Sequence, residues 1–379
     1  GKKVQWNRES SGAVGHLDTE NLDKVLDMFA TNLGIGKNAK YIKHLFKGAY
    51  LEHDNLADAT RFLANELFGS YGLVIIDADD NKLKSLFTPY VKKELLEQLS
   101  YKKVSESNDK INELGIKVQV NPREINLFYL KDSLRERIVF ENGVYKVNDT
   151  NISWSKIELL KHLDEAPECF SPNVIMRPLY QEVILPNLCY IGGGGEIAYW
   201  LQLKSFFESV NVPFPMLLLR NSVLIKTAKQ SEKLQKLNLS IKELFSKQDI
   251  LVNNQVKKHS KIDIDFTQQK EQLQNQFKTL FKVADQTDKS FIGAVAAQEK
   301  KQLKGLINLE KRLLKAQKRK LSEQISRITE IQNQLFPGKS LQERNLNFSE
   351  LYLEFGDQLI QQLMLNLQPL KGEFLILEL

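Results

Sequence analysis

A run of four glycines at residues 192–195 is the feature of this sequence that best suits ligand chemistry. Glycine allows the backbone to turn tightly and to approach a ligand closely. A helical pattern follows the run, and the start of a helix presents unpaired N–H groups and a partial positive charge. A phosphate or a carboxylate would bind at such a place. We therefore interpret the run as a candidate anion-binding loop. The open alternative is that its glycines only permit close packing where the helix begins.

The loop departs from two familiar nucleotide-binding patterns. Gly193, Gly195 and Ala198 fit the G-x-G-x-x-[GA] pattern of dinucleotide-binding loops. However, Arg220 follows the next predicted strand, where a nicotinamide enzyme needs an acidic residue to hold the ribose. Glu196, in the first turn of the helix, would also repel a pyrophosphate. No Lys-Ser/Thr pair follows the glycines, so the loop is not a Walker A loop either. These departures disfavour a nicotinamide oxidoreductase.

Polar side chains around the loop complete the candidate site. Arg177 carries a planar, permanently charged group that suits bidentate recognition of a carboxylate or a phosphate. Glu196 could act as a base or as the partner of an ammonium group, and no residue here is a convincing nucleophile. We predict Arg177 and Glu196 as catalytic residues, with a purely local structural role as the alternative. The predicted substrate-binding residues are Asn173, Gln181, Gly192, Gly193, Gly194, Gly195, Tyr199 and Arg220.

The cysteines and histidines indicate no metal site. Cys169 and Cys189 form no CxxC pair, and the five histidines are scattered without HExxH spacing. We interpret the two cysteines as small buried hydrophobic residues in a reducing cytoplasm. No apolar stretch is long enough to span a membrane.

The elements expected to position the candidate site alternate between strands and helices. A β-α-β unit is predicted from a strand at 187–191, a helix at 196–210 and a strand at 216–219. An uninterrupted apolar run at 71–77 predicts a buried parallel strand. Its acidic end, at 77–80, would lie at the sheet edge where ligands gather in such folds. The pattern as a whole indicates an α/β fold with a nucleotide-binding core.

Local signals predict further elements in the first half of the chain. Apolar residues recur every three or four positions over 56–68, which predicts a helix. Strands are expected at 117–120, 126–129 and 137–147, and the last contains Asn142-Gly143, which is typical of a type I′ hairpin. A capping box beginning at Ser155 predicts the start of another helix.

The second half of the chain changes to a helical, heptad-patterned composition. One set of residues spaced by seven, Phe266, Leu273 and Leu280, and a second set from Ile307 to Leu335 predict an antiparallel coiled coil. The bend is expected at 285–288. A final helix at about 347–365 and an apolar strand at 374–379 close the chain, and we expect that strand to join a sheet. The predicted domains are a core at residues 1–227, a helical and coiled-coil region at 228–337, and a C-terminal helix and strand at 338–379.

Lysines and arginines form a basic stripe on the predicted coiled coil, which suggests RNA as one partner. However, aromatic side chains for base stacking are absent between Phe291 and Leu335. A solvated face or an acidic partner helix is the commoner meaning of such a run, and the net charge of +6 is mild for 379 residues. We therefore expect no nucleic acid. A coiled-coil module that binds nucleic acid or protein, with a nucleotide-binding core, remains the alternative to an enzyme.

Several separate motifs identify a family resemblance. They are Ser171-Pro-Asn-Val174, Arg177-Pro-Leu179, Gln181, Leu185-Pro186, Tyr190 to Trp200, Asn55 to Thr60, Leu67 to Gly72, Asp77 to Asp80, Leu341 to Arg344, and Asn347-Phe348. In these motifs the sequence resembles the bacillithiol biosynthesis cysteine-adding enzymes, and the resemblance covers essentially its whole length.

The resemblance implies a ligase that joins the carboxyl group of L-cysteine to the amine of glucosaminyl-malate, forming a carbon–nitrogen amide bond. It implies a Rossmann-like core with inserted connective segments, a C-terminal coiled coil that forms a homodimer, and a cytoplasmic location. Because a carboxylate and an amine do not condense in water, we expect ATP, with Mg²⁺, to activate the carboxyl group. The resemblance also associates an adenine nucleotide with the C-terminal end. The polar residues there that we predict to bind it are Gln342, Glu343, Arg344 and Asn347, with ordinary helix capping as the alternative.

Two departures from the family pattern affect these expectations. Family members usually have proline where Gly194 stands, so this loop is expected to be looser. The family also begins with a longer N-terminal stretch that carries a Thr-Gly-Gln-Gln loop and an acidic, His-containing strand end. We therefore expect this chain to be a fragment, truncated within the core, whose catalytic site is incomplete.

Overall fold

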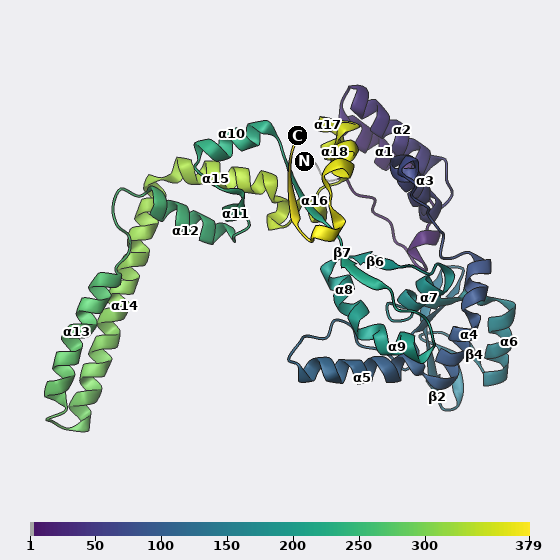
Figure 1. Cartoon of the computed structure of the whole chain (residues 1–379), viewed down its shortest axis with the longest axis horizontal. Helices are drawn as coiled ribbons and strands as arrows, with labels where there is room; N and C mark the ends of the chain where they lie inside the picture. The colour runs from purple at the N-terminus through teal and green to yellow at the C-terminus, as the bar shows by residue number, and fades with distance from the viewer. Residues whose placement is uncertain (1–3) are drawn as a thin grey trace. The chain divides into compact units, whose positions relative to one another are not determined.

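The computed structural model describes residues 4–379, and the chain divides into two compact units. Unit 1 comprises residues 1–221 and 349–373, and unit 2 comprises residues 222–348 and 374–379. Figure 1 shows the elements of both, coloured by residue number. The two units are defined by contacts within the fold. The three domains expected from the sequence are defined by changes in composition, and their boundaries remain a prediction.

Unit 1 is mixed α/β. Its α-helices are α1 (Leu22–Leu33), α2 (Lys37–Leu51), α3 (Leu56–Phe68), α4 (Asn81–Glu97), α5 (Leu99–Glu113), α6 (Lys156–Glu165), α7 (Arg177–Ile184), α8 (Gly194–Trp200), α9 (Lys204–Ser209), α17 (Phe348–Phe355) and α18 (Gln358–Asn366). Its short 3-10 helices are η1 (Val14–His16), η2 (Gly69–Tyr71), η3 (Pro167–Cys169), η4 (Leu201–Leu203) and η6 (Pro369–Lys371). Its strands are β1 (Leu127–Lys131), β2 (Leu134–Glu141), β3 (Val144–Val147), β4 (Ser153–Trp154), β5 (Phe170–Pro172), β6 (Cys189–Gly192) and β7 (Met216–Leu219).

The larger sheet of unit 1 is antiparallel, with strand order β4-β3-β2-β1-β5. Strands β2 and β3 are joined by Asn142 and Gly143, whose φ angles are 52° and 81°. Two positive φ angles in a two-residue loop define the predicted type I′ turn, so the hairpin is confirmed. The predicted strand at 126–129 corresponds to β1, and the capping box at Ser155 is present at the start of α6.

The predicted β-α-β unit is confirmed. Strands β6 and β7 pair in parallel, from Cys189 opposite Met216 to Gly192 opposite Leu219. The connecting segment is not the single helix expected at 196–210, because it is divided into α8, a 3-10 turn and α9. Trp200, at the end of α8, and Phe206 and Phe207, in α9, are all buried.

Two predicted strands of unit 1 are wrong. Among the described residues, nothing pairs with residues 73–77, and Leu73, Val74 and Ile76 are 46%, 79% and 38% exposed. Residues 117–120 also form no strand, because the backbone N–H groups of Gln119 and Val120 donate to the side chain of Gln202. An apolar run becomes a strand only where another backbone completes its hydrogen bonds.

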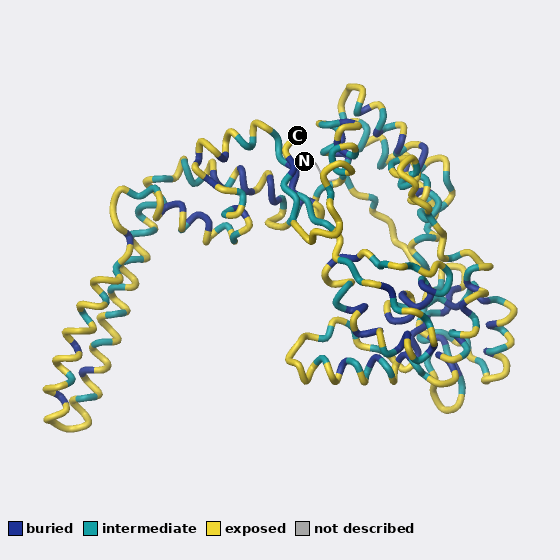
Figure 2. Tube along the Cα trace, in the orientation of Figure 1, coloured by how far each residue is buried: buried dark blue, intermediate teal, exposed yellow. Residues whose placement is uncertain are grey.

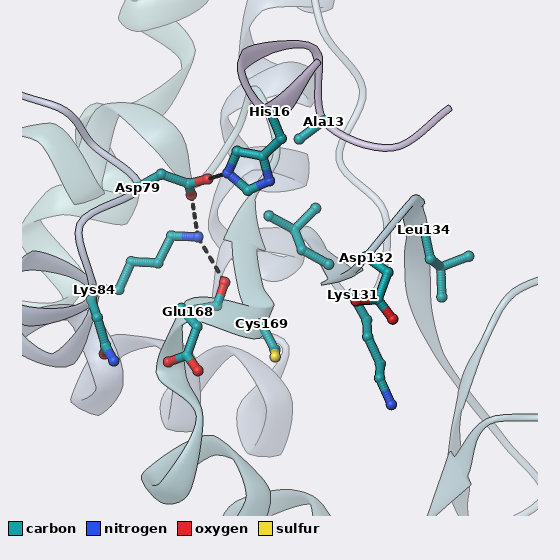
Figure 3. A pocket seen from close by; sticks show the side chains of 11 residues that line it. Ala13, His16, Asp79, Lys84, Lys131, Asp132, Leu134, Glu168 and Cys169 are labelled. Carbon is teal, nitrogen blue, oxygen red and sulfur yellow. Dashed lines mark hydrogen bonds and ion pairs between the residues drawn. The ribbon is translucent and has the colours of Figure 1, made fainter. Parts of the chain in front are cut away.

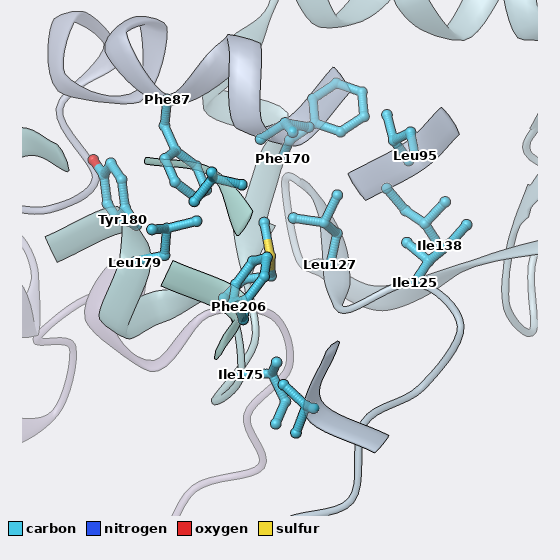
Figure 4. Close-up of a cluster of buried hydrophobic side chains, with 14 of the residues drawn as sticks. Phe87, Leu95, Ile125, Leu127, Ile138, Phe170, Ile175, Leu179, Tyr180 and Phe206 are labelled. Carbon is cyan, nitrogen blue, oxygen red and sulfur yellow. The ribbon is translucent and has the colours of Figure 1, made fainter. Parts of the chain in front are cut away.

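The core of unit 1 joins several elements around one cluster (Figure 4). Phe87 of α4, Leu127 of β1, Leu179 of α7 and Phe206 of α9 all belong to it, and each is at most 2% exposed. Burial of such a side chain stabilises a fold by about 1.5–3 kcal/mol. The cluster therefore fixes α7, the helix that begins with Arg177.

Unit 2 is mostly helical. Its elements are β8 (Ser222–Lys226), α10 (Ala228–Lys236), α11 (Ile241–Leu244), α12 (Gln248–His259), α13 (Thr267–Ala284), α14 (Lys289–Lys320), α15 (Ser322–Leu335), η5 (Pro337–Lys339), α16 (Gln342–Asn345) and β9 (Phe374–Glu378). Helices α13 and α14 lie side by side and run in opposite directions, as predicted for the coiled coil (Figure 1). The bend falls at residues 285–288, and Asp288 caps the start of α14.

In the rest of unit 2, one predicted element differs from the structure and one agrees with it. The second long helix was expected to continue to Leu335, but it is interrupted at Leu321, where the backbone leaves helical geometry. The C-terminal strand joins a sheet as predicted, because β9 pairs in parallel with β8. Figure 2 shows that exposed residues predominate along α13 and α14, whereas buried residues gather along α12 and α15. None of the helices in the described residues has the length and apolar character needed to cross a membrane.

Candidate functional site

The glycine-rich loop connects β6 to α8. Gly193 is the N-cap of α8, and its backbone N–H donates to Oε2 of Glu196 at 2.7 Å. The carboxylate therefore lies at the start of the helix and takes one of the N–H donors that the sequence offered to a ligand. The fixed negative charge of Glu196 would repel a free anion at the remaining N–H donors. It would instead attract an ammonium group or a phosphate that carries a bound metal ion.

The four glycines differ in what surrounds them. A Cβ added at Gly192 would lie 2.7 Å from Cε1 of Tyr190 and 3.2 Å from Cβ of Glu196, so this position requires glycine. A Cβ added at Gly195 would meet nothing within 4 Å, and Gly194 and Gly195 are both exposed. The outer face of the loop is therefore open, as close approach of a ligand requires.

Tyr190 lies among three of the predicted site residues. Arg177 donates to the hydroxyl group of Tyr199 at 3.5 Å, a long contact that leaves most of the guanidinium donors for other partners. Burial raises the pKa of Tyr190, the neighbouring Tyr199 and Glu196 raise it further, and the positive charge of Arg177 opposes them. The structure thus brings Arg177, Glu196 and Tyr199 together around one phenol.

Tyr190 is a site residue that the sequence analysis missed as a separate candidate. Its ring stacks on Trp200, with the ring centroids 3.9 Å apart. The available signal was an aromatic residue directly before the glycines, but the same signal is typical of a core position. Only the structure shows that its environment includes charged groups.

Asn173 and Gln181 have partners within the protein. Oδ1 of Asn173 accepts from the N–H groups of Ile175 and Met176 at 2.8 and 3.3 Å, and its Nδ2 donates to Asn126 at 2.9 Å. Asn173 therefore organises the turn that leads into α7 and Arg177. Gln181 donates to the carboxylate of Glu182 at 3.3 Å. Their roles in binding substrate remain predictions.

Arg220 lies directly after β7, and its backbone N–H donates to the carbonyl of Gly192 at 2.9 Å. This bond places Arg220 beside the glycine-rich loop at the carboxyl ends of the two parallel strands. Such ends are where ligands bind in open α/β sheets. Arg177 and Arg220 are thus the two arginines that the structure associates with this loop.

The predicted nucleotide-binding residues lie in unit 2, around α16. Gln342 is buried, and its amide group donates to and accepts from the backbone of Ile225 in β8, both at 2.8 Å. Ser222 donates to Glu343 at 3.4 Å, and Arg344 and Asn347 lie at or near the end of the same short helix. The side-chain amide of Gln342 thus pairs with the backbone of β8 as a neighbouring strand would. Nucleotide binding by these four residues remains a prediction.

We expect Gln342→Ala to lower the stability of unit 2 by about 2 kcal/mol, because it leaves two buried backbone groups of Ile225 unpaired. All tryptophans of the chain, Trp6, Trp154 and Trp200, lie in unit 1. The loss should therefore lower the midpoint of helix melting by circular dichroism while the tryptophan fluorescence transition stays in place. Gln334→Ala, on the exposed face of α15, is the matched control. An equal effect of both variants would contradict the role of Gln342.

A separate cavity of about 460 Å³ lies elsewhere in unit 1 (Figure 3). In its wall, the carboxylate of Asp79 forms ion pairs with both His16 and Lys84. Lys84 is only 5% exposed, and its ammonium also donates to the backbone carbonyl of Glu168 at 2.8 Å. A buried charge is tolerated when it is paired and hydrogen-bonded in this way.

The thiol of Cys169 also lines this cavity, and the carboxylate of Glu168 and the phenol of Tyr129 are its ionisable neighbours. In Figure 3 the carboxylate of Glu168 points away from the Lys84 ammonium, on the same side as the thiol of Cys169. Burial raises the pKa of that thiol, as does the charge of Glu168. Burial, together with the neighbouring Cys169, raises the pKa of Tyr129 to about 12. The thiol and the phenol are therefore protonated at neutral pH.

This cavity is not predicted from the sequence. Residues 77–80 are interpreted there as the ligand-side end of a strand and as a motif of the resemblance, and Cys169 as a small buried hydrophobic residue. Cys169 is in fact half-buried and lines the cavity. No cluster of three His, Cys, Asp or Glu side chains suited to a metal ion occurs in residues 4–379 as the structure describes them.

The fold and the glycine-rich loop define a two-unit protein with a Rossmann-like unit and a coiled-coil unit. A Rossmann-like α/β unit carries a glycine-rich loop between parallel strands, and a second unit carries an antiparallel helical coiled coil. Comparison with protein families matches residues 1–221 to the N-terminal Rossmann-like domain of bacillithiol biosynthesis BshC, and residues 223–379 to its C-terminal coiled-coil domain. The chain therefore belongs to the bacillithiol biosynthesis BshC family.

Individual relatives agree with this assignment, and each is named "Putative cysteine ligase BshC". The relative from Flavobacterium johnsoniae is 61% identical over 377 residues, and that from Christiangramia forsetii is 59% identical over 381 residues. Both matches cover 100% of this chain and 71% of the relative. A more distant relative from Lysinibacillus sphaericus is 25% identical and is matched over 94% of this chain and 68% of its own length.

Proposed function

We propose that this chain belongs to a cysteine ligase of bacillithiol biosynthesis that joins the carboxyl group of L-cysteine to the amine of glucosaminyl-malate. Family membership over both domains and the names of the relatives support a cysteine ligase. The amide bond and the second substrate come from the resemblance described in the sequence analysis.

The observation that carries the proposal is the group of charges beside the glycine-rich loop. The charges of Arg177, at the start of α7, and of Glu196, in the first turn of α8, both act on Tyr190 of β6. A guanidinium group and backbone N–H groups suit a phosphate or a carboxylate, and a carboxylate suits an ammonium group or Mg²⁺. This set of groups fits both a nucleotide and an amino acid.

Formation of the amide requires activation of the cysteine carboxylate, which ATP with Mg²⁺ would supply. Arg177 and Arg220 would hold the anionic groups, and the exposed N–H groups of Gly194 and Gly195 would add neutral donors. Glu196, held against the N–H of Gly193, would orient the incoming amine and accept its proton. A base that is already hydrogen-bonded in this way is fixed in position before the substrate binds.

The coiled coil is proposed to form a homodimer in the cytoplasm. Apolar side chains remain exposed on α13 and α14 even though the two helices pack on each other. These side chains are Leu280, Val283, Phe291, Ile307 and Leu309, which are 39–54% exposed. Packing of a second coiled coil would remove them from water. The basic residues of α14 are proposed to remain solvated, without nucleic acid.

The test is a turnover assay on a protein of the relatives' full length that contains this chain. The mixture holds ATP, Mg²⁺, L-cysteine and glucosaminyl-malate, and mass spectrometry detects the amide product. Formation of the product only when ATP is present would support the proposal. No product, together with no thermal stabilisation by any nucleotide or by cysteine, would reject it in favour of a coiled-coil binding protein.

A further inference from the structure

The guanidinium group of Arg177 is held in place mainly by the backbone from which it extends. The side chain is exposed, and its contact with the hydroxyl group of Tyr199 is long, at 3.5 Å. Its position therefore follows the start of α7. A displacement of about 1 Å in a group that positions substrate can lower a reaction rate roughly 100-fold. The residues that hold α7 in place are thus candidates for a role in the reaction.

Asn126 holds the turn that leads into α7. Its backbone carbonyl accepts from the N–H of Asn173 at 3.0 Å, and its Oδ1 accepts from Nδ2 of Asn173 at 2.9 Å. The carbonyl of Asn173 in turn accepts from the N–H of Arg177 at 2.8 Å. Asn126 is 0% exposed, and its side-chain amide donates to Ser100 at 2.6 Å and to the carbonyl of Arg123 at 2.7 Å. Because it cannot contact a ligand, its effect on one must pass through the turn.

Tyr180 provides a second anchor of α7, one turn after Arg177. Its hydroxyl group donates to the carbonyl of Ala78 at 2.6 Å, and its ring is 3% exposed and lies 5.0 Å from the ring of Phe87. In Figure 4 the oxygen of Tyr180 points away from the other side chains drawn in the core cluster. Burial, together with the aspartates of residues 77–80, raises the pKa of Tyr180, so the hydroxyl group keeps its proton and remains a donor.

The turn at residues 77–80, which accepts this hydrogen bond, is itself fixed to α4. Asp80 caps α4 by accepting from a backbone N–H at 3.1 Å, and Asp79 forms an ion pair with the buried Lys84 of the same helix. Helix α7 has eight residues, and so short a helix is not stable by itself. Its position and direction are therefore set by its anchors to the rest of unit 1.

We propose that Asn126 and Tyr180 are positioning residues of the ligase, which fix the place of Arg177 without touching a substrate. Asn126 acts through the turn before α7, and Tyr180 acts through the body of the helix. The inference rests on the proposed function, because it assigns both residues a part in that reaction.

Tyr180→Phe is the cleaner test, because it removes one hydroxyl group and keeps the ring in the core. Tyr145→Phe is its matched control: the hydroxyl group of Tyr145 donates to the carbonyl of Leu95 at 2.8 Å, and its ring is 4% exposed in the same core cluster. Both variants should lose a similar amount of stability. We expect kcat/KM to fall about tenfold in Tyr180→Phe alone, measured in a protein of the relatives' full length well below every melting temperature.

Asn126→Ala should lower kcat/KM further, by about 30-fold, because it frees the turn next to Arg177. Its control is Asn108→Ala, which also removes a buried amide. The side chain of Asn108 accepts from Gln202 at 2.5 Å and donates to the carbonyl of Val120 at 3.1 Å. The control should lose stability but keep its kcat/KM. Tyr180→Phe alone decides the inference if Asn126→Ala does not fold.

A double-mutant cycle separates positioning from a general loss of structure. In the Arg177→Ala background, Tyr180→Phe should leave kcat/KM unchanged within about twofold, because no guanidinium group remains to be placed. Its loss of stability should persist in that background. A residue with a purely structural role would lower both quantities equally in the two backgrounds.

Amide hydrogen exchange tests the anchors without turnover. In the 379-residue chain, Tyr180→Phe and Asn126→Ala should speed exchange at least about fivefold in peptides that cover residues 173–184, because local opening of α7 then costs less free energy. The Tyr145 and Asn108 controls should leave these peptides unchanged. If no form of the protein makes product, the proposed function fails, whereas the exchange result still decides whether the two residues hold α7 in place.

Three results would overturn the inference. The first is unchanged exchange of residues 173–184 in both variants. The second is a kcat/KM of Tyr180→Phe equal to that of Tyr145→Phe. The third is a loss of kcat/KM by Tyr180→Phe that is as large in the Arg177→Ala background as in the native one, since such additivity means that Tyr180 does not act through Arg177.

Discussion

Replacement of Arg177 with alanine is expected to lower ligase turnover about 100-fold while leaving the protein folded, since a hydrogen bond to a charged group contributes about 1.5–3 kcal/mol. The side chain is exposed at the start of α7, and its contact with Tyr199 is long. Its loss therefore removes little from the fold but removes a cation from the anion-binding side of the glycine-rich loop. The measurement is kcat/KM for L-cysteine and for ATP in a protein of the relatives' full length.

Two further variants make the Arg177 result specific. Arg177→Lys keeps the charge but not the planar pair of donors, so its turnover should lie between those of the native protein and the alanine variant. Arg137→Ala removes an exposed arginine from β2, in the other sheet, and should have no effect. Full turnover in Arg177→Ala would show that the glycine-rich loop is not the catalytic anion site.

Replacement of Glu94 with alanine is expected to destabilise unit 1 by about 4 kcal/mol, because it leaves several buried donors without an acceptor. The Glu94 carboxylate accepts from the N–H and hydroxyl groups of Ser100 at 3.0 and 2.6 Å. It also accepts from the N–H and side-chain amide of Asn126 at 2.9 and 3.3 Å. All three residues are at most 1% exposed. Urea unfolding followed by tryptophan fluorescence reports on unit 1, which contains every tryptophan of the chain.

Removal of the Glu94 carboxylate should also disturb the geometry of the candidate site. Asn126 accepts a hydrogen bond from Asn173, and Asn173 organises the turn before Arg177. Glu94→Ala is therefore expected to lower turnover even at temperatures where unit 1 remains folded. Glu97→Ala, an exposed position in the last turn of the same helix, is the control for both measurements. A stability loss equal to that of the control would contradict the network.

The same residue predicts a pH dependence. Burial raises the pKa of Glu94 in the folded protein, in spite of its hydrogen bonds. The folded state thus holds the proton more tightly than the unfolded state, in which the pKa of glutamate is about 4.3. The resulting stabilisation is complete below that value and is lost as the pH rises through the raised pKa. Glu94→Gln cannot titrate, so its unfolding free energy should fall less over this range. Parallel curves for the two proteins would contradict the assignment.

The sequence was sufficient for features that depend on nearby residues. The helix at 56–68, the Asn142-Gly143 turn and the capping box at Ser155 all occur as predicted. Each rests on side-chain period or on hydrogen bonds within a few residues, so its cause is present in the local sequence. The same holds for the position of the glycine-rich loop between two parallel strands. The antiparallel pair of helices also occurs as predicted, but its buried seam differs from the predicted heptad sets: Leu280 and Ile307 are exposed, whereas Phe277, Ala284 and Val295 are buried.

Only the tertiary structure shows the contacts between residues that are far apart in the sequence and the partner that each side chain takes. The apolar run at 71–77 has the composition of a strand, but strand formation depends on a partner backbone, and the described residues provide none. Glu196 could have faced a ligand freely, but it caps its own helix. The cavity brings His16, Asp79 and Glu168 together from distant parts of the chain. No spacing rule links such residues, because the core packing of α4 and the β1–β2 hairpin sets the distances between them.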